Sequence, residues 1–304
     1  MMRYRTFGRL GWRVSEIGLG AAWLFGHLDR SNTLDQSIAV VRQALSLGIN
    51  YIDTARYYRR SEEILGHALQ GVSQPYYLAT KAGCEPADFD YSCDAVLRSF
   101  ETSLRVLRRE RVDLLQIHEA NTATWKQIIG PGGALEALHR LKKEGLVTGI
   151  GITGRNPSFL ARLADTGEFD SVLTYSDYDL TTRLAREVLI PTALRCGAAV
   201  VLGSPLRGGL LGPKCLDVIE HHPEAVAQKA RRLFEALSHS GPLHHLGIRY
   251  LLSDPDVSVI LSGSASVGEI CDVVKAAEAG PLSQDIVATI RQVQEAGGAR
   301  ERDV

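Results

Sequence analysis

The chain has 304 residues, of which 45% are hydrophobic and 23% are charged, and its formal net charge is −1. This composition supports a large buried core, and the length is ordinary for a single α/β barrel. No basic run indicates a nucleic-acid partner, and no apolar stretch approaches the roughly 18 residues that span a bilayer. The N-terminus lacks the apolar block of a signal peptide. The five cysteines have neither metal-ligand nor redox spacing, so we expect reduced thiols in a cytoplasmic protein.

Along the chain, a predicted hairpin comes first. Tyr4–Phe7 and Arg13–Ser15 flank the turn at residues 8–11, and we expect this hairpin to cover the bottom of the fold. Eight short apolar runs follow, as expected for buried parallel strands. They are Ile17–Leu19, Tyr51–Asp53, Tyr76–Thr80, Val112–Ile117, Val147–Ile152, Ser171–Tyr175, Ala198–Gly203 and Val257–Leu261.

Helical patterns lie between these runs. The clearest are Thr33–Ser46, Cys93–Leu107, Ala134–Lys143 and Arg183–Cys196, and Gly48 and Gly145 are typical helix stops. Eight strands that alternate with helices predict a (β/α)8 TIM barrel with an N-terminal β-hairpin, while a doubly wound open sheet remains the alternative. Residues 1–304 have no Pro/Ser-rich linker, so we expect one domain, with residues 296–304 as a loose tail.

Polar side chains stand where three neighbouring strands end. Asp53 ends the second strand and Tyr58 follows in its loop, Lys81 ends the third strand, and His118 ends the fourth. Active sites of this fold lie at the C-terminal ends of the strands. Tyrosine is a weak acid with a reference pKa of about 10, and a nearby ammonium lowers that pKa. The group therefore predicts proton transfer to or from a carbonyl or hydroxyl oxygen, with Asp53 holding Lys81 and His118 orienting the substrate oxygen.

Each of these residues alone also has a structural interpretation. Asp53 could cap the following segment, Tyr58 could line a pocket, Lys81 could be a surface lysine, and His118 could be a core histidine. Their occurrence together at adjacent strand ends favours catalysis.

The same residues resemble the aldo-keto reductase family. The stretch 53–66, Asp-Thr-Ala-Arg-Tyr-Tyr-Arg-Arg-Ser-Glu-Glu-Ile-Leu-Gly, is similar to the family's tyrosine signature, whose spacing selects Tyr58 and not Tyr57. Residues 79–81 resemble its lysine strand, residues 113–118 its histidine strand, and residues 8–20 its N-terminal hairpin and first strand. The resemblance implies a barrel enzyme with a nicotinamide cofactor. Arg59 is a departure, since the family usually has glycine there.

The resemblance also implies where the cofactor binds. Gly18-x-Gly20-x-x-Trp23 lacks the third glycine of a dinucleotide fingerprint, so the loops at the barrel mouth are expected to hold the cofactor instead. The stretch 204–211 resembles the family's pyrophosphate loop, residues 153–154 its carboxamide site, and residues 263–272 its adenosine segment. The implied contacts are Gly20, Ala22, Thr153, Gly154, Tyr175, Ser204, Leu206, Gly209, Gly263, Ser264, Ser266, Glu269 and Asp272.

Glu269 bears on the choice between NAD and NADP. Family members that prefer NADP place a cation at this position for the ribose 2′-phosphate, whereas a carboxylate repels that phosphate and can accept a hydrogen bond from a free 2′-hydroxyl. We therefore favour NAD. The alternative is that Glu269 is only a solvated residue in the first turn of a helix.

Four further segments, including residues 78–83 and 173–178, resemble the branch of L-galactose, L-fucose and threo-aldose dehydrogenases. That resemblance implies oxidation of a small sugar to its lactone, with Trp23, Tyr57 and Glu119 near the substrate. Two other functions stay open: an NADPH-dependent aldehyde or ketone reductase, and a cofactor-binding regulatory subunit without catalysis. The doublets His221-His222 and His244-His245 suggest a metal, but adjacent residues on a helix are not expected to converge, so no metal site is predicted.

Overall fold

The computed structural model describes residues 1–27, 30–85, 88–219 and 222–296. Eight parallel strands close into a barrel in the order β10-β11-β12-β3-β6-β7-β8-β9, which confirms the predicted barrel and excludes the open sheet. The strands are β3 (Ile17–Gly20), β6 (Tyr51–Asp53), β7 (Tyr77–Ala82), β8 (Val112–Ile117), β9 (Val147–Gly154), β10 (Ser171–Tyr175), β11 (Ala199–Gly203) and β12 (Val259–Ser262). Each of the eight apolar runs overlaps one of them.

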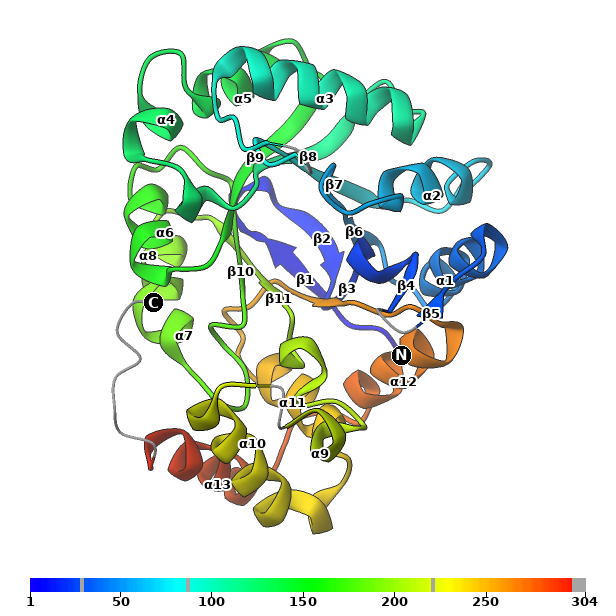
Figure 1. The fold of residues 1–304 in the computed structure, drawn as a ribbon, viewed down its shortest axis with the longest axis vertical. Coiled ribbons are helices and arrows are strands. Elements are labelled where there is room, and N and C mark those ends of the chain that lie inside the picture. Colours follow the sequence, from blue (N-terminus) through cyan, green and yellow to red (C-terminus); the bar gives the residue numbers. More distant parts are fainter. Residues whose placement is uncertain (28–29, 86–87, 220–221, 297–304) are drawn as a thin grey trace.

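Helices surround the barrel (Figure 1). They are α1 (Leu34–Ser46), α2 (Ser61–Ala68), α3 (Cys93–Leu107), α4 (Trp125–Ile129), α5 (Ala134–Lys143), α6 (Pro157–Ala164), α7 (Leu184–Val188), α8 (Ile190–Arg195), α9 (Cys215–Val218), α10 (Glu224–Leu237), α11 (Leu243–Leu252), α12 (Val267–Glu278) and α13 (Gln284–Glu295). Thr33 forms a capping box at the start of α1, and Gly48 takes a φ of 87° just after its end, as the sequence predicts.

The predicted single helix over Arg183–Cys196 is wrong, because the segment forms two short helices, α7 and α8. Pro191 has no backbone N–H to donate to the preceding turn, and it lies in the first turn of α8, where that donor is not required. The break therefore follows from a residue that the helical pattern alone ignored.

The N-terminal hairpin of β1 (Tyr4–Phe7) and β2 (Trp12–Ser15) lies across one end of the barrel (Figure 1). Phe7 stacks on Tyr51 at the first residue of β6, with ring centroids 5.2 Å apart, and Trp12 stacks on Tyr77 at the first residue of β7, at 4.7 Å. Both partners lie at strand N-termini, so the hairpin closes the bottom of the barrel as expected, and the opposite end carries the polar residues. A second small hairpin pairs β4 (Gly26–His27) with β5 (Arg30–Ser31).

Three further observations concern properties predicted from the sequence. All five cysteines are unpaired, as expected. In the described part of the chain, no helix is long and apolar enough to cross a membrane. The proposed tail falls largely on residues 297–304, which lie outside the described residues.

Candidate active site

The C-terminal ends of β6, β7 and β8 bring together the four residues of the predicted proton-transfer group, which are Asp53, Tyr58, Lys81 and His118. Asp53 is the last residue of β6, Lys81 lies one residue before the end of β7, and His118 directly follows β8. Tyr58 lies in the loop between β6 and α2. Neighbouring parallel strands end at one rim, so residues separated by up to 65 positions become neighbours there.

A buried ion pair forms the base of this group. Lys81 is fully buried, and its Nζ donates to Asp53 Oδ1 and to the carbonyl oxygen of Thr54, the latter at 2.8 Å. The other Asp53 oxygen accepts from Gln116 Nε2 at 2.8 Å. Burial alone would lower the pKa of Lys81, but Asp53 and Tyr58 outweigh it, and the pKa is raised. Lys81 is therefore a fixed cation inside the barrel mouth.

Tyr58 lies beside that cation. Lys81 Nζ is 4.7 Å from the centre of the Tyr58 ring. Burial raises the pKa of Tyr58, Lys81 lowers it, and the nearby carboxylates Asp53 and Glu119 raise it. The pKa of Tyr58 is raised overall. Lys81 does lower it, as predicted, but by less than burial and the carboxylates raise it. Desolvation dominates because the phenolate would lose more hydration than one cation restores.

His118 packs edge-on against both neighbouring tyrosines. Its ring centroid is 5.4 Å from that of Tyr58 and 5.8 Å from that of Tyr57. Burial, followed by the charge of Lys81, holds the pKa of His118 well below its usual value. Its buried Nδ1 has no hydrogen-bond partner among the described residues. The neutral imidazole can therefore orient a substrate oxygen without adding another charge.

A carboxylate and a phenol extend the group on the side of β10. The hydroxyl of Tyr175 donates to Glu119, whose two carboxylate oxygens both lie 3.0 Å away. Glu119 Oε1 is 3.9 Å from His118 Nε2, and burial raises the pKa of Glu119. Glu119 and Tyr57 thus lie against the proton-transfer group.

Two further predicted cofactor loops follow β9 and β11. Thr153 and Gly154 end β9, and the buried Oγ1 of Thr153 has no hydrogen-bond partner within the described ranges. After β11, Ser204 takes a φ of 48° and Gly209 a φ of 98°, on either side of Leu206. Arg207, in the same loop, bonds Asp179 at 2.8 Å. Because Asp179 is fully buried, this ion pair anchors the β11 loop to the loop after β10.

The predicted adenosine segment contacts the loop after β3. A Cβ atom on Gly263 would lie 2.8 Å from Trp23, so the absence of a side chain permits this approach. Glu269 Oε2 accepts from the backbone N–H of Ala265 at 2.8 Å and lies 3.2 Å from His27 Nε2. Ser266 caps α12, and the hydroxyls of Ser262 and Ser264 are 2.7 Å apart. Gly20 ends β3, and Ala22 lies in the short 3-10 helix Ala21–Trp23 that follows. Glu269 is thus both exposed and engaged in local structure.

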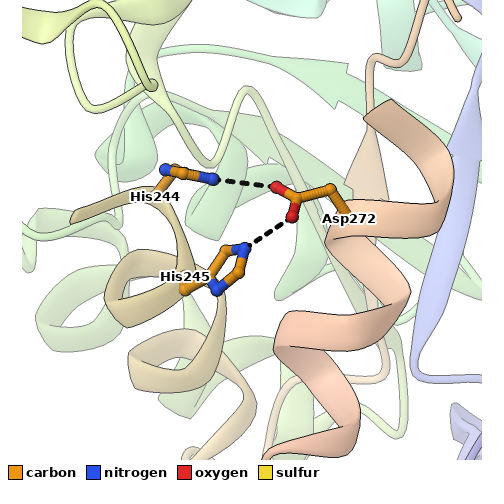
Figure 2. A group of neighbouring side chains, drawn as sticks. All are labelled: His244, His245 and Asp272. Atoms are coloured by element: carbon orange, nitrogen blue, oxygen red, sulfur yellow. Dashed lines mark hydrogen bonds and ion pairs between the residues drawn. The ribbon is translucent and has the colours of Figure 1, made fainter. Parts of the chain in front are cut away.

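Asp272 has a different environment from the one predicted. Its two oxygens bond the Nε2 atoms of His244 and His245, at 2.8 and 2.9 Å (Figure 2). The argument that adjacent histidines on a helix cannot converge is therefore wrong here, because a carboxylate on the neighbouring helix presents one oxygen to each ring. The other doublet includes His221, which lies outside the described residues.

Sequence reasoning missed two buried polar residues close to Asp53 and Lys81. Gln116, two residues before His118 on the same face of β8, holds the second oxygen of Asp53. Glu62 is buried in α2 and accepts from Thr80 Oγ1 at 2.7 Å. Gln116 is polar and, unlike Asp113, lies near the C-terminal end of β8, a signal that could have identified it.

Comparison with known proteins agrees with this geometry. A model of the aldo/keto reductase family matches residues 16–295. The chain is 31% identical to L-galactose dehydrogenase from Arabidopsis thaliana, covering 96% of this chain and 94% of that protein. It is 26% identical to pyridoxal 4-dehydrogenase from Microbacterium luteolum, covering 88% and 90%. The holo form of aldo-keto reductase AKR11C1 from Bacillus halodurans superimposes with a TM-score of 0.84 at 27% identity, covering 99% of both chains.

A closed (β/α)8 barrel with Asp53, Tyr58, Lys81 and His118 at its mouth defines a nicotinamide-dependent oxidoreductase. The chain belongs to the aldo/keto reductase family.

Proposed function

We propose that this enzyme oxidises an aldose to its lactone with NAD, using Tyr58 as the general base. The contact between Tyr58 and Lys81, whose ammonium Asp53 holds in place, carries this proposal, because the ammonium favours the phenolate that accepts a proton. Tyr58 would take the proton of the anomeric hydroxyl while the C–H bond breaks and the carbonyl of the lactone forms. A bound nicotinamide supplies the hydride acceptor.

The other residues then have defined tasks. Asp53 and Gln116 hold the Lys81 ammonium, and His118, whose Nδ1 is unpaired among the described residues, orients the substrate oxygen. In the reductive direction, Tyr58 would return the proton to the carbonyl oxygen. The raised pKa of Tyr58 keeps the hydroxyl protonated at neutral pH, so oxidation should be favoured by alkaline solution.

The residues at the barrel mouth fit a nicotinamide dinucleotide. Thr153 shares a face of β9 with Gly149 and Gly151, which lie against residues inside the barrel. Its hydroxyl, which has no partner in the described part of the chain, suits a carboxamide. The backbone around Ser204, Leu206 and Gly209 suits a pyrophosphate, and Tyr175 would pack near the nicotinamide ring. We place the adenosine beside Gly263, Ser264 and Ser266, with Gly20 and Ala22 lining the first loop.

The preference for NAD rests on Glu269. Its side chain is 45% exposed, so it can face the ribose while it accepts from Ala265. Repulsion of a 2′-phosphate by this carboxylate is the physical reason for the preference. Asp272, by contrast, is held by two histidines and would reach the adenosine only if that contact opened.

The sugar substrate is supported by similarity to L-galactose dehydrogenase and by the polar Glu119–Tyr175 pair, which can bond hydroxyl groups. Trp23 and Tyr57 are exposed aromatic residues that could pack on a sugar ring. Similarity to pyridoxal 4-dehydrogenase makes pyridoxal a second substrate to test. The unpaired cysteines support a cytoplasmic location.

A panel of sugars, pyridoxal and simple aldehydes tests the proposal, with NAD and NADP in both directions and nicotinamide absorbance as the readout. We expect NAD-linked oxidation of at least one aldose. Efficient NADPH-linked reduction of aldehydes without oxidation of any sugar would instead establish the reductase alternative. Cofactor binding without turnover of any compound would favour the regulatory alternative.

A further inference from the structure

His244, His245 and Asp272 form a compact cluster outside the proposed reaction centre. The histidines lie in the first turn of α11 and the aspartate in α12, the helices before and after β12 (Figure 2). One ligand atom from each residue lies within 4.8 Å of the other two. The centroids of the two imidazole rings are 4.5 Å apart, and both rings present Nε2 to the same carboxylate.

The donor set matches a divalent transition metal. Two imidazoles and one carboxylate are ligands that Zn²⁺ binds at about 2.0–2.2 Å, usually with a fourth position for water. Tetrahedral ligands at that distance are about 3.3 Å apart. The present contacts of 2.8 and 2.9 Å would need to open by only about half an ångström to admit an ion.

Solvent access also suits a cation. The side chains of Asp272, His244 and His245 are 40%, 14% and 18% exposed. An ion can therefore arrive from solvent and keep a water ligand.

We propose that His244, His245 and Asp272 bind one divalent transition-metal ion, with Zn²⁺ as the probe. Each imidazole would coordinate through an unprotonated Nε2, with its proton carried on Nδ1, and the ion bridges α11 and α12. The ion would tie together the helices on either side of the last barrel strand.

The test uses the full chain after treatment with a chelator. Calorimetric titration with Zn²⁺ and elemental analysis after desalting should show one equivalent per chain. His244→Gln, His245→Gln and Asp272→Asn should each weaken binding by about tenfold or more. His139→Gln is the matched control, because His139 also contacts a carboxylate, that of Glu168 at 3.0 Å, on the surface. This control should bind Zn²⁺ as the unmodified chain does.

Folding and coordination are checked separately. Far-ultraviolet circular dichroism of the metal-free variants establishes that each remains folded, and Co²⁺ should give visible absorption in the unmodified chain that is lost in the three variants. Absence of saturable Zn²⁺ binding, or equal binding by Asp272→Asn, would overturn the proposal and leave the cluster as a hydrogen-bonded contact between helices. The readout is metal binding, so the result is independent of the proposed reaction.

Discussion

The hydroxyl of Tyr175 lies 3.0 Å from both carboxylate oxygens of Glu119. This contact holds a second carboxylate, besides that of Asp53, at the edge of the proton-transfer group. Glu119 takes a φ of 46°, an uncommon conformation for a residue with a side chain. Its charge contributes to the raised pKa of Tyr58. The pair is therefore coupled electrostatically to the proposed base.

Glu119→Gln should move the pH profile of oxidation to lower pH. The substitution removes a negative charge that raises the pKa of Tyr58, while the amide oxygen can still accept from Tyr175. The measurement is kcat against pH for sugar oxidation. An unchanged or upward-shifted midpoint would contradict the coupling.

Tyr58→Phe should reduce kcat by about 10² to 10⁴-fold, the range expected for loss of a general acid or base. Dinucleotide affinity should change little, as measured by quenching of intrinsic fluorescence. Tyr57→Phe is the matched control and should lose far less activity, since phenylalanine keeps the ring that contacts His118 and could pack on a sugar. Comparable losses in both variants would contradict the selection of Tyr58.

Arg59→Gly should be about 1 kcal/mol more stable than Arg59→Ala. Arg59 is exposed and has a φ of 45°, where a Cβ atom costs about 1–2 kcal/mol and the greater freedom of glycine in the unfolded chain offsets part of the gain. Urea unfolding of both variants measures the difference. If alanine is equally stable, the backbone strain assigned to this position is absent.

Glu62→Gln should stabilise the folded protein at neutral pH. Burial raises the folded-state pKa of Glu62 above its ordinary value of 4.5, so the folded chain binds more protons than the unfolded chain. The contribution of protonated Glu62 to the free energy of unfolding is therefore present at low pH. It is lost as the pH rises through the raised folded-state pKa. The gain in free energy of unfolding should therefore vanish near pH 4.

Glu63→Gln is the control for that experiment. The Glu63 side chain is exposed and bonded to Arg60, which lowers its pKa, so its replacement should be neutral or slightly destabilising at pH 7. Equal effects of the two substitutions would indicate that burial of Glu62 is not the cause.

Glu269→Arg should shift the ratio of kcat/KM values for NADP and NAD toward NADP by about tenfold, the effect of one charge-assisted contact of roughly 1.5 kcal/mol. Glu269→Gln, which can still accept from Ala265, separates removal of repulsion from gain of attraction. A ratio that neither variant changes would mean that Glu269 serves only to order the start of α12.

The sequence pattern predicted the barrel because buried parallel strands appear as short apolar runs, and it placed Asp53, Lys81 and His118 at their ends. The third apolar run ends at Thr80, but β7 continues to Ala82, and Asp53 compensates the charge that Lys81 brings inside the barrel. Desolvation at Tyr58 and the contacts of Asp272 with two histidines depend on three-dimensional packing. Neither could be derived from spacing along one helix or strand.

The pairing of β12 with β3 has a consequence for how the molecule folds. The proton-transfer group comes from residues 53–118, whereas the barrel closes only when residues 260–262 reach residues 17–19. Closure therefore requires a contact between segments more than 240 positions apart, the kind of contact that forms slowly. During synthesis, the edges of β3 and of the newest strand would stay exposed until β12 has emerged, which makes this the interval most vulnerable to aggregation.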